Sequence, residues 1–298
     1  MNLNYIFLTA DGSRLRAGWR LLIQTVVMLI GFSCFGIPLI VIYYFLDPAS
    51  AFTGRLTPAL LLLTTLVQTF AFTTSIFLAR RFLDKQSIES LGLKINRQAL
   101  FDLLAGIGVT FIQMGLIYVV MRSLGWLTFK GFAWDVDPLG QVIGNTLIFL
   151  FVFVLVGWNE ELLSRGYHLQ TLASGFNLFW GVIISSTVFG FLHIFNPGSS
   201  WVAVLGITVA GFYFAFAYLR AKQLWLPIGL HIGWNFFEGV VFGFPISGLD
   251  IYPLTRIDVT GPVLWTGGAF GPEAGLIVLP SLIVGGLLIY LFTRNRSS

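Results

Sequence analysis

A few ionisable and amide side chains interrupt the apolar stretches in the second half of this chain. They are Glu160, Glu161, Arg165, His193, His231, Asn235 and Glu238. Ionisable groups are costly in apolar surroundings, so each of them is a candidate functional residue. A carboxylate or an imidazole can act as a general base on water, and an amide can donate a hydrogen bond to an oxyanion. These residue types can take part in acid–base chemistry or line an ion path.

The spacing of these residues predicts which side chains meet. Residues four apart on a helix share a face, so Glu161 and Arg165 can form an ion pair. Glu160 is rotated by about 100° from its neighbour, which leaves its carboxylate free to point into a bundle. His231 and Asn235 share a face by the same rule.

Composition indicates where these groups lie. Of the 298 residues, 56% are hydrophobic and only 10% are charged, and the mean hydropathy is +0.86. Soluble proteins keep about a quarter of their residues charged, so a sizeable soluble domain is excluded. The single cysteine, Cys34, excludes a disulfide within the chain and a Cys-rich metal site. We predict an all-α, polytopic transmembrane bundle.

A helix needs about 20 apolar residues to cross the hydrocarbon. Eight stretches qualify, and the first is expected to be a retained spanning helix and not a cleaved signal. The predicted helices are Leu21–Leu46, Leu56–Ala79, Ala99–Met121, Val142–Trp158, Asn177–Phe195, Trp201–Leu219, Trp225–Phe244 and Ala274–Phe292. Residues 245–272, rich in Gly and Pro, are expected to form an external loop.

Basic residues predict the orientation. Eight spans place both termini on one side, and 13 of the 17 Lys and Arg residues fall on that side. Because Lys and Arg are retained in the cytoplasm, we expect both termini to be cytoplasmic and the protein to lie in the plasma membrane. The net charge of +4 is scattered along the chain, which favours a lipid bilayer over nucleic acid as the partner.

Three short motifs occur in order, each in its own predicted helix. They are Glu160-Glu161-Leu-Leu-Ser-Arg165, Phe189-Gly-Phe-Leu-His193 and His231-Ile-Gly-Trp-Asn235. Together they resemble the Glu-Glu-x-x-x-Arg, Phe-x-x-x-His and His-x-x-x-Asn motifs of the CAAX-protease and bacteriocin-processing family of intramembrane proteases. The resemblance covers residues 140–240, with weaker support from Ser90-Leu-Gly-Leu93.

The resemblance implies a role for each motif residue. Glu160 and His193 activate the water, and His231 and Asn235 stabilise the oxyanion. Glu161 and Arg165 hold the site together, while Phe189 packs beneath His193. The implied activity is a glutamate-type endopeptidase without a cofactor, and the implied substrate is a membrane-associated or lipidated peptide or protein.

The chain is accordingly divided into three parts. Residues 1–130 hold the first three helices and a cytoplasmic connector. Residues 131–245 form the catalytic core, and residues 246–298 contain the external loop and the last helix.

Other functions remain open from the sequence. A transporter or ion channel would use Glu160, His193, His231 and Glu238 as an ion path. The Gly-rich segment 267–273 supports it, because such a break can bind an anion through backbone N–H groups.

A non-catalytic immunity or scaffold protein would keep the fold alone. A zinc peptidase would use Glu160, His193 and His231 as ligands, although no His-Glu-x-x-His helix occurs. The role of Glu238 is left open.

Overall fold

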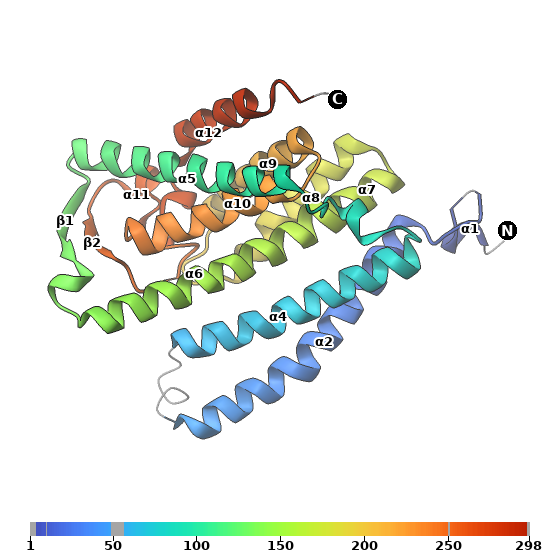
Figure 1. Cartoon of the computed structure of the whole chain (residues 1–298), viewed down its shortest axis with the longest axis horizontal. Helices are drawn as coiled ribbons and strands as arrows, with labels where there is room; N and C mark the ends of the chain where they lie inside the picture. The colour runs from blue at the N-terminus through green and yellow to red at the C-terminus, as the bar shows by residue number, and fades with distance from the viewer. Residues whose placement is uncertain (1–3, 10, 49–56, 250, 297–298) are drawn as a thin grey trace.

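A computed structural model describes residues 4–9, 11–48, 57–249 and 251–296. It is a bundle of helices (Figure 1), which confirms the predicted fold class. Leu56, the first residue of the second predicted helix, lies outside the described residues, as does Arg55, one of the four basic residues predicted on the side opposite the termini.

Each of the eight predicted stretches coincides with a helix. The long helices are α2 (Ala17–Leu46), α4 (Pro58–Leu78), α5 (Arg97–Ser123), α6 (Leu139–Glu161), α8 (Leu178–Leu192), α9 (Trp201–Ala221), α10 (Trp225–Asn235) and α12 (Val278–Thr293). Short helices are α1 (Asn4–Phe7), α7 (Gln170–Gly175) and α11 (Val263–Thr266). Within the described part of the chain, 6 helices are long and apolar enough to cross a membrane. The exceptions among the predicted eight are α10 and α12, which are shorter.

Polar residues set where several helices begin. The side chains of Thr57, Asn96, Asn177 and Ser200 each accept a hydrogen bond from the backbone N–H three residues further on, at the starts of α4, α5, α8 and α9. Such caps satisfy an N–H group that has no partner within the helix.

Two helices change their winding at the predicted motifs. The first motif begins at the end of α6 and continues into a π-helical segment, Leu162–Leu169. The third motif ends α10, which continues as a π-helical segment, Phe236–Val241. π-Helical turns are rare and often occur at functional sites.

Helix α10 lies at the centre of the bundle, in close contact with α5. A Cβ atom at Gly229 would lie 2.1 Å from the carbonyl oxygen of Leu103, and one at Gly106 would lie 2.5 Å from that of Leu226. Only glycine permits this approach, which is the usual way for membrane helices to pack closely. Ten of the eleven residues of α10 can thus be buried behind α5, and they include His231 and Asn235.

The predicted external loop contains more structure than expected. Strand β1 (Leu127–Phe132) pairs in antiparallel fashion with β2 (Thr255–Val259), and the register is irregular between Phe129 and Gly131. Asp137 fixes this end of the bundle, because its carboxylate accepts hydrogen bonds from the Tyr252 hydroxyl at 2.8 Å and from Arg256 at 2.7 Å. β2 alternates β-branched with charged residues, a pattern typical of a half-exposed strand.

Candidate active site

The first motif makes a buried ion pair that also holds the third motif. Arg165 Nη1 donates to Glu161 Oε1 at 2.8 Å, as the four-residue spacing predicted. The same Glu161 oxygen accepts a hydrogen bond from His231 Nδ1, also at 2.8 Å, and Arg165 Nη2 donates to the carbonyl oxygen of Gly211 at 2.9 Å. Glu161 is 0% and Arg165 1% exposed. Glu161 therefore links α6 to α10, and its side chain is not accessible to solvent.

Aromatic rings enclose this pair. The Arg165 guanidinium lies 4.4 Å from the centroid of the Phe189 ring and 5.1 Å from that of Phe214. Phe214 also stacks on the His231 imidazole, with centroids 5.1 Å apart and an interplanar angle of 6°. Phe189 contacts the His193 ring at 5.0 Å, so it packs where the sequence placed it. Phe214 on α9 was not predicted, because it lies outside the three motifs.

Glu160 points away from Glu161 and toward both histidines. Its Oε2 atom lies 3.8 Å from His193 Nε2 and 3.7 Å from His231 Nε2. These distances exceed a direct hydrogen bond, and a water that contacts both atoms would lie beside the line that joins them. The Glu160 side chain is 25% exposed, unlike its neighbour. The two adjacent glutamates thus differ in burial, because Glu160 is partly exposed and Glu161 is fully buried.

The hydrogen bonds at Nδ1 determine the tautomer of each imidazole. His193 Nδ1 lies 2.8 Å from the carbonyl oxygen of Phe189, which can only accept, so Nδ1 carries the hydrogen. His231 Nδ1 likewise donates to the Glu161 carboxylate. Neutral His193 therefore presents the lone pair of Nε2 toward Glu160. The Phe-x-x-x-His motif orients its own histidine through a backbone carbonyl one turn earlier.

The four predicted catalytic residues line one cavity of about 440 Å³. They are Glu160, His193, His231 and Asn235. Most of the remaining wall is apolar, and it includes Met28 of α2, Leu61 and Phe72 of α4, and Phe153 of α6. All three predicted parts of the chain therefore contribute to this cavity. The division at residues 130 and 245 stays a prediction, but it does not separate the site from the rest of the molecule.

Sequence reasoning missed Glu273 as a residue of this site. Glu273 lines the cavity. Its Oε1 accepts from the Trp234 indole at 3.0 Å, and its Oε2 accepts from the Ser247 amide at 2.9 Å and hydroxyl at 2.5 Å. Trp234 precedes Asn235, and Ser247 is further held at its carbonyl by the Asn196 amide at 3.1 Å. We interpret Glu273 as a positioning residue that fixes segment 246–249 at the cavity wall.

This segment is strained at Ser247, whose φ of +44° is unusual for a residue other than glycine. The Gly-rich segment before Glu273 is folded into short 3-10 turns, Gly268–Phe270 and Pro272–Ala274. The feature of the sequence that could have indicated Glu273 is its position as an acidic residue at the end of a Gly-rich run.

We expect Glu273→Gln to loosen segment 246–249. The substitution removes a carboxylate that accepts three hydrogen bonds, and each hydrogen bond to a charged group contributes about 1.5–3 kcal/mol. Amide hydrogen exchange of residues 246–249 in detergent should therefore be at least about tenfold faster. Glu89→Gln, at an exposed position, is the control. Unchanged exchange in Glu273→Gln would contradict the assigned role.

Glu238 follows Asn235 by three residues but does not share its cavity. It is 0% exposed, its Oε1 would be 3.2 Å from a Cβ atom at Gly271, and it is not part of the cavity wall.

The donor atoms suit zinc in type, but not in their present spacing. The Nε2 atoms of His193 and His231 face a carboxylate oxygen, and each Nδ1 is hydrogen-bonded, as is common behind metal ligands. Among the described residues, however, no group of three or more His, Cys, Asp or Glu side chains is arranged to hold a metal ion.

The comparison with known proteins found matches to the segment that contains the three motifs. Residues 142–237 match the family described as type II CAAX prenyl endopeptidase Rce1-like. The chain is also 36% identical over 78 residues to the Bacillus subtilis (strain 168) protein named "Putative membrane peptidase YdiL". That match spans 26% of this chain and 30% of the relative. No solved structure matches. The matched family segment contains all three motifs, and the resemblance predicted from them, to the CAAX-type membrane endopeptidases, is confirmed.

Proposed function

We propose that this chain is an intramembrane endopeptidase that hydrolyses a peptide bond with a water activated by Glu160 and His193. The observation that supports this most strongly is the Glu160 carboxylate, which faces the Nε2 atoms of both motif histidines at 3.7 and 3.8 Å in one largely apolar cavity. The similarity to membrane endopeptidases supports the same reaction.

The reaction begins with a water between Glu160 and the lone pair of His193. Glu160 takes one proton of this water while His193 Nε2 accepts a hydrogen bond from its second hydrogen, and the water oxygen attacks the peptide carbonyl. His231 in its imidazolium form, stabilised by Glu161, donates from Nε2 to the developing oxyanion. Asn235 lines the same cavity, and its amide is the second donor. The proton held by the base then passes to the leaving amine as the C–N bond breaks.

The apolar wall suggests the class of substrate. A cavity lined by Met28, Leu61, Phe72 and Phe153 favours a peptide segment with apolar or lipidated side chains near the scissile bond. A membrane-associated or lipidated protein supplies such a segment.

Comparative proteomics tests this function. Membranes from cells that express the wild-type chain should contain new peptide termini that are absent with Glu160→Gln. Glu89→Gln, at an exposed position, should match the wild type. Identical termini in all three samples would overturn the proposal.

Neither alternative function is favoured by an observation. The ion path of a transporter would need Glu238, which is not part of the cavity wall that contains the other three residues. A scaffold would not require the Nε2 atoms of two histidines to converge on one carboxylate.

We propose further that the enzyme needs no tightly bound metal. Elemental analysis of the purified, active protein tests this directly. Stoichiometric zinc that is lost with activity on chelation, and restored with it, would make Glu160, His193 and His231 ligands instead.

We expect both termini to be cytoplasmic, because 13 of the 17 basic residues lie on their predicted side. Reporter fusions at positions 90, 222 and 298 should report the cytoplasm, and a fusion at position 130 should report the opposite side. An extracellular signal at position 90 or 298 would invert the assignment.

A further inference from the structure

A second cavity, of about 610 Å³, lies at the start of α2. Its wall includes the first turn of α2 and the end of α7, with Arg16, Gly18, Trp19, Arg20, Ser174 and Phe176. It shares no residue with the cavity that contains Glu160. The proposed peptidase reaction leaves it without a role.

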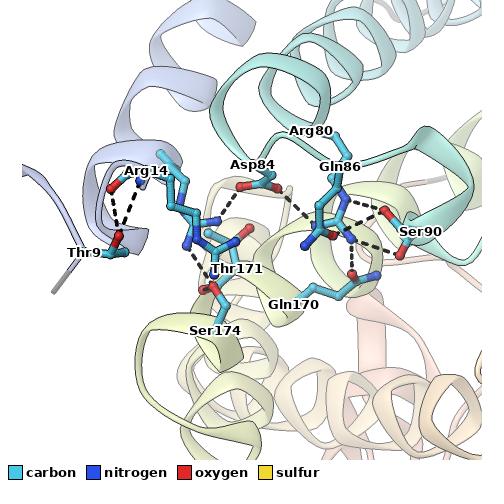
Figure 2. A network of polar contacts seen from close by, with 10 residues as sticks. Thr9, Arg14, Arg80, Asp84, Gln86, Ser90, Gln170, Thr171 and Ser174 are labelled. Atoms are coloured by element: carbon cyan, nitrogen blue, oxygen red, sulfur yellow. Dashed lines mark hydrogen bonds and ion pairs between the residues drawn. The ribbon is translucent and has the colours of Figure 1, made fainter. Parts of the chain in front are cut away.

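The cavity borders a buried cluster with excess positive charge. Arg20 and Arg80 are both buried, and both form ion pairs with Asp84. Figure 2 shows Asp84 with Ser174 on one side and with Ser90 and Gln170 on the other. Within the described chain, Asp84 is the one carboxylate that bonds to either arginine. Two guanidinium groups thus share a single negative charge, which is unfavourable in a buried site unless another anion approaches.

One donor of Arg20 has no partner within the described chain. Its Nη1 donates to Asp84 and its Nη2 donates to the Ser174 hydroxyl at 2.8 Å. Its Nε is buried and has no hydrogen-bond partner among the described residues. Arg20 is only 1% exposed, yet it forms part of the cavity wall.

The first turn of α2 adds backbone donors. The N-cap residue, Arg16, makes no side-chain cap, so the N–H groups of the first turn are available to a ligand. A Cβ atom at Gly18 would have nothing within 4 Å, so the backbone is open to the cavity there. The positive end of the helix dipole favours an anion at this position, and phosphate groups commonly bind in this way.

An apolar groove continues from the same cavity. It has a volume of about 420 Å³ and shares Trp19 and Leu22 with the cavity. Its other lining residues, Phe7, Leu15, Ile23, Val26 and Val27, are all apolar. A ligand that fills both spaces has an anionic group joined to a hydrocarbon chain.

The length of α2 places this site at the depth of lipid headgroups. Its 30 residues extend about 45 Å, whereas the hydrocarbon core is about 30 Å thick. The first turn can therefore reach the headgroup region while the rest of α2 faces the lipid chains.

We propose that the first turn of α2 binds an anionic phospholipid. The phosphate group contacts Arg20, Arg16 and the open backbone at Gly18, and one acyl chain follows the groove along Leu22 and Val26. The favoured source of the phosphate is a lipid, because the apolar groove is continuous with the cavity that contains Arg16 and Arg20.

Native mass spectrometry of the purified full chain tests this site, with phosphatidylglycerol and phosphatidylcholine as probes. The wild type should retain phosphatidylglycerol at least about tenfold more strongly than phosphatidylcholine, since both lipids carry the phosphate but the cationic choline of phosphatidylcholine is repelled by the excess arginine charge. Gly18→Leu should lower the affinity for phosphatidylglycerol about tenfold, because the new side chain fills the cavity and leaves every ion pair in place. Arg16→Gln, at an exposed position, should also lower the affinity for phosphatidylglycerol.

The matched control is Gly108→Leu on α5, where a Cβ atom also has nothing within 4 Å. It should bind phosphatidylglycerol like the wild type. Inorganic phosphate at millimolar concentration should not displace the lipid, because it cannot occupy the groove. The proposal is overturned if Gly18→Leu binds like the wild type, if both lipids bind equally, or if inorganic phosphate competes as well as short-chain phosphatidylglycerol does.

Discussion

Replacing Glu160 with glutamine is expected to reduce peptide hydrolysis by about 10²–10⁴-fold, the usual contribution of a general base. The amide of glutamine keeps the size of the side chain but cannot take a proton from water. His193→Ala should cause a loss of similar size, because the two groups lie 3.8 Å apart and act on the same water. The measurement is kcat/KM on a peptide that spans a cleavage site found in the membrane proteome.

The double substitution separates joint action from independent contributions. Residues that act as a unit are not additive, so Glu160→Gln combined with His193→Ala should cost little more than either change alone. Multiplication of the two single losses would show that the residues act on different steps. Retention of wild-type activity by Glu160→Gln would remove this residue from the reaction.

Replacing Arg165 with alanine is expected to destabilise the folded protein by about 3–5 kcal/mol, the usual cost of leaving a buried charge without its partner. Glu161 would then remain fully buried with His231 as its one hydrogen-bonding partner. The Phe189 and Phe214 rings would lose the guanidinium that lies between them. Thermal unfolding in detergent measures the effect.

Glu160→Gln and Lys94→Ala are the controls for this experiment. Glu160 is partly exposed and Lys94 is exposed, so both variants should unfold close to the wild type. Equal destabilisation by Glu160→Gln and Arg165→Ala would mean that the two glutamates do not divide structural and chemical roles as their surroundings indicate.

Helical spacing predicted much of the site. The pairing of Glu161 with Arg165 follows from a separation of four residues, and the free direction of Glu160 follows from the rotation of one residue. The prediction that the first and second motifs meet in one site came from the family resemblance and not from spacing. Periodicity describes one helix at a time, and it contains no information on which helices are neighbours.

Other features depend on tertiary contacts that leave no local pattern. The π-helical winding of Leu162–Leu169 and the second bond of Glu161, to His231, appear only when α6 packs on α10. Glu273 lies 35 residues beyond Glu238 in a segment that reads as a loop, yet it folds back on Trp234. β1 and β2 are short and far apart in the sequence, so their pairing was missed.

The most direct test of the account is hydrolysis in H₂¹⁸O by the purified chain reconstituted in proteoliposomes, with a substrate peptide identified from the membrane proteome. If a water activated by Glu160 attacks the carbonyl, the new carboxyl terminus of the product should contain one ¹⁸O atom. The labelled product should be absent with Glu160→Gln, while Glu89→Gln should produce it at the wild-type rate. Labelled product formed equally by Glu160→Gln, or movement of an intact peptide across the membrane without cleavage, would contradict the proposed function.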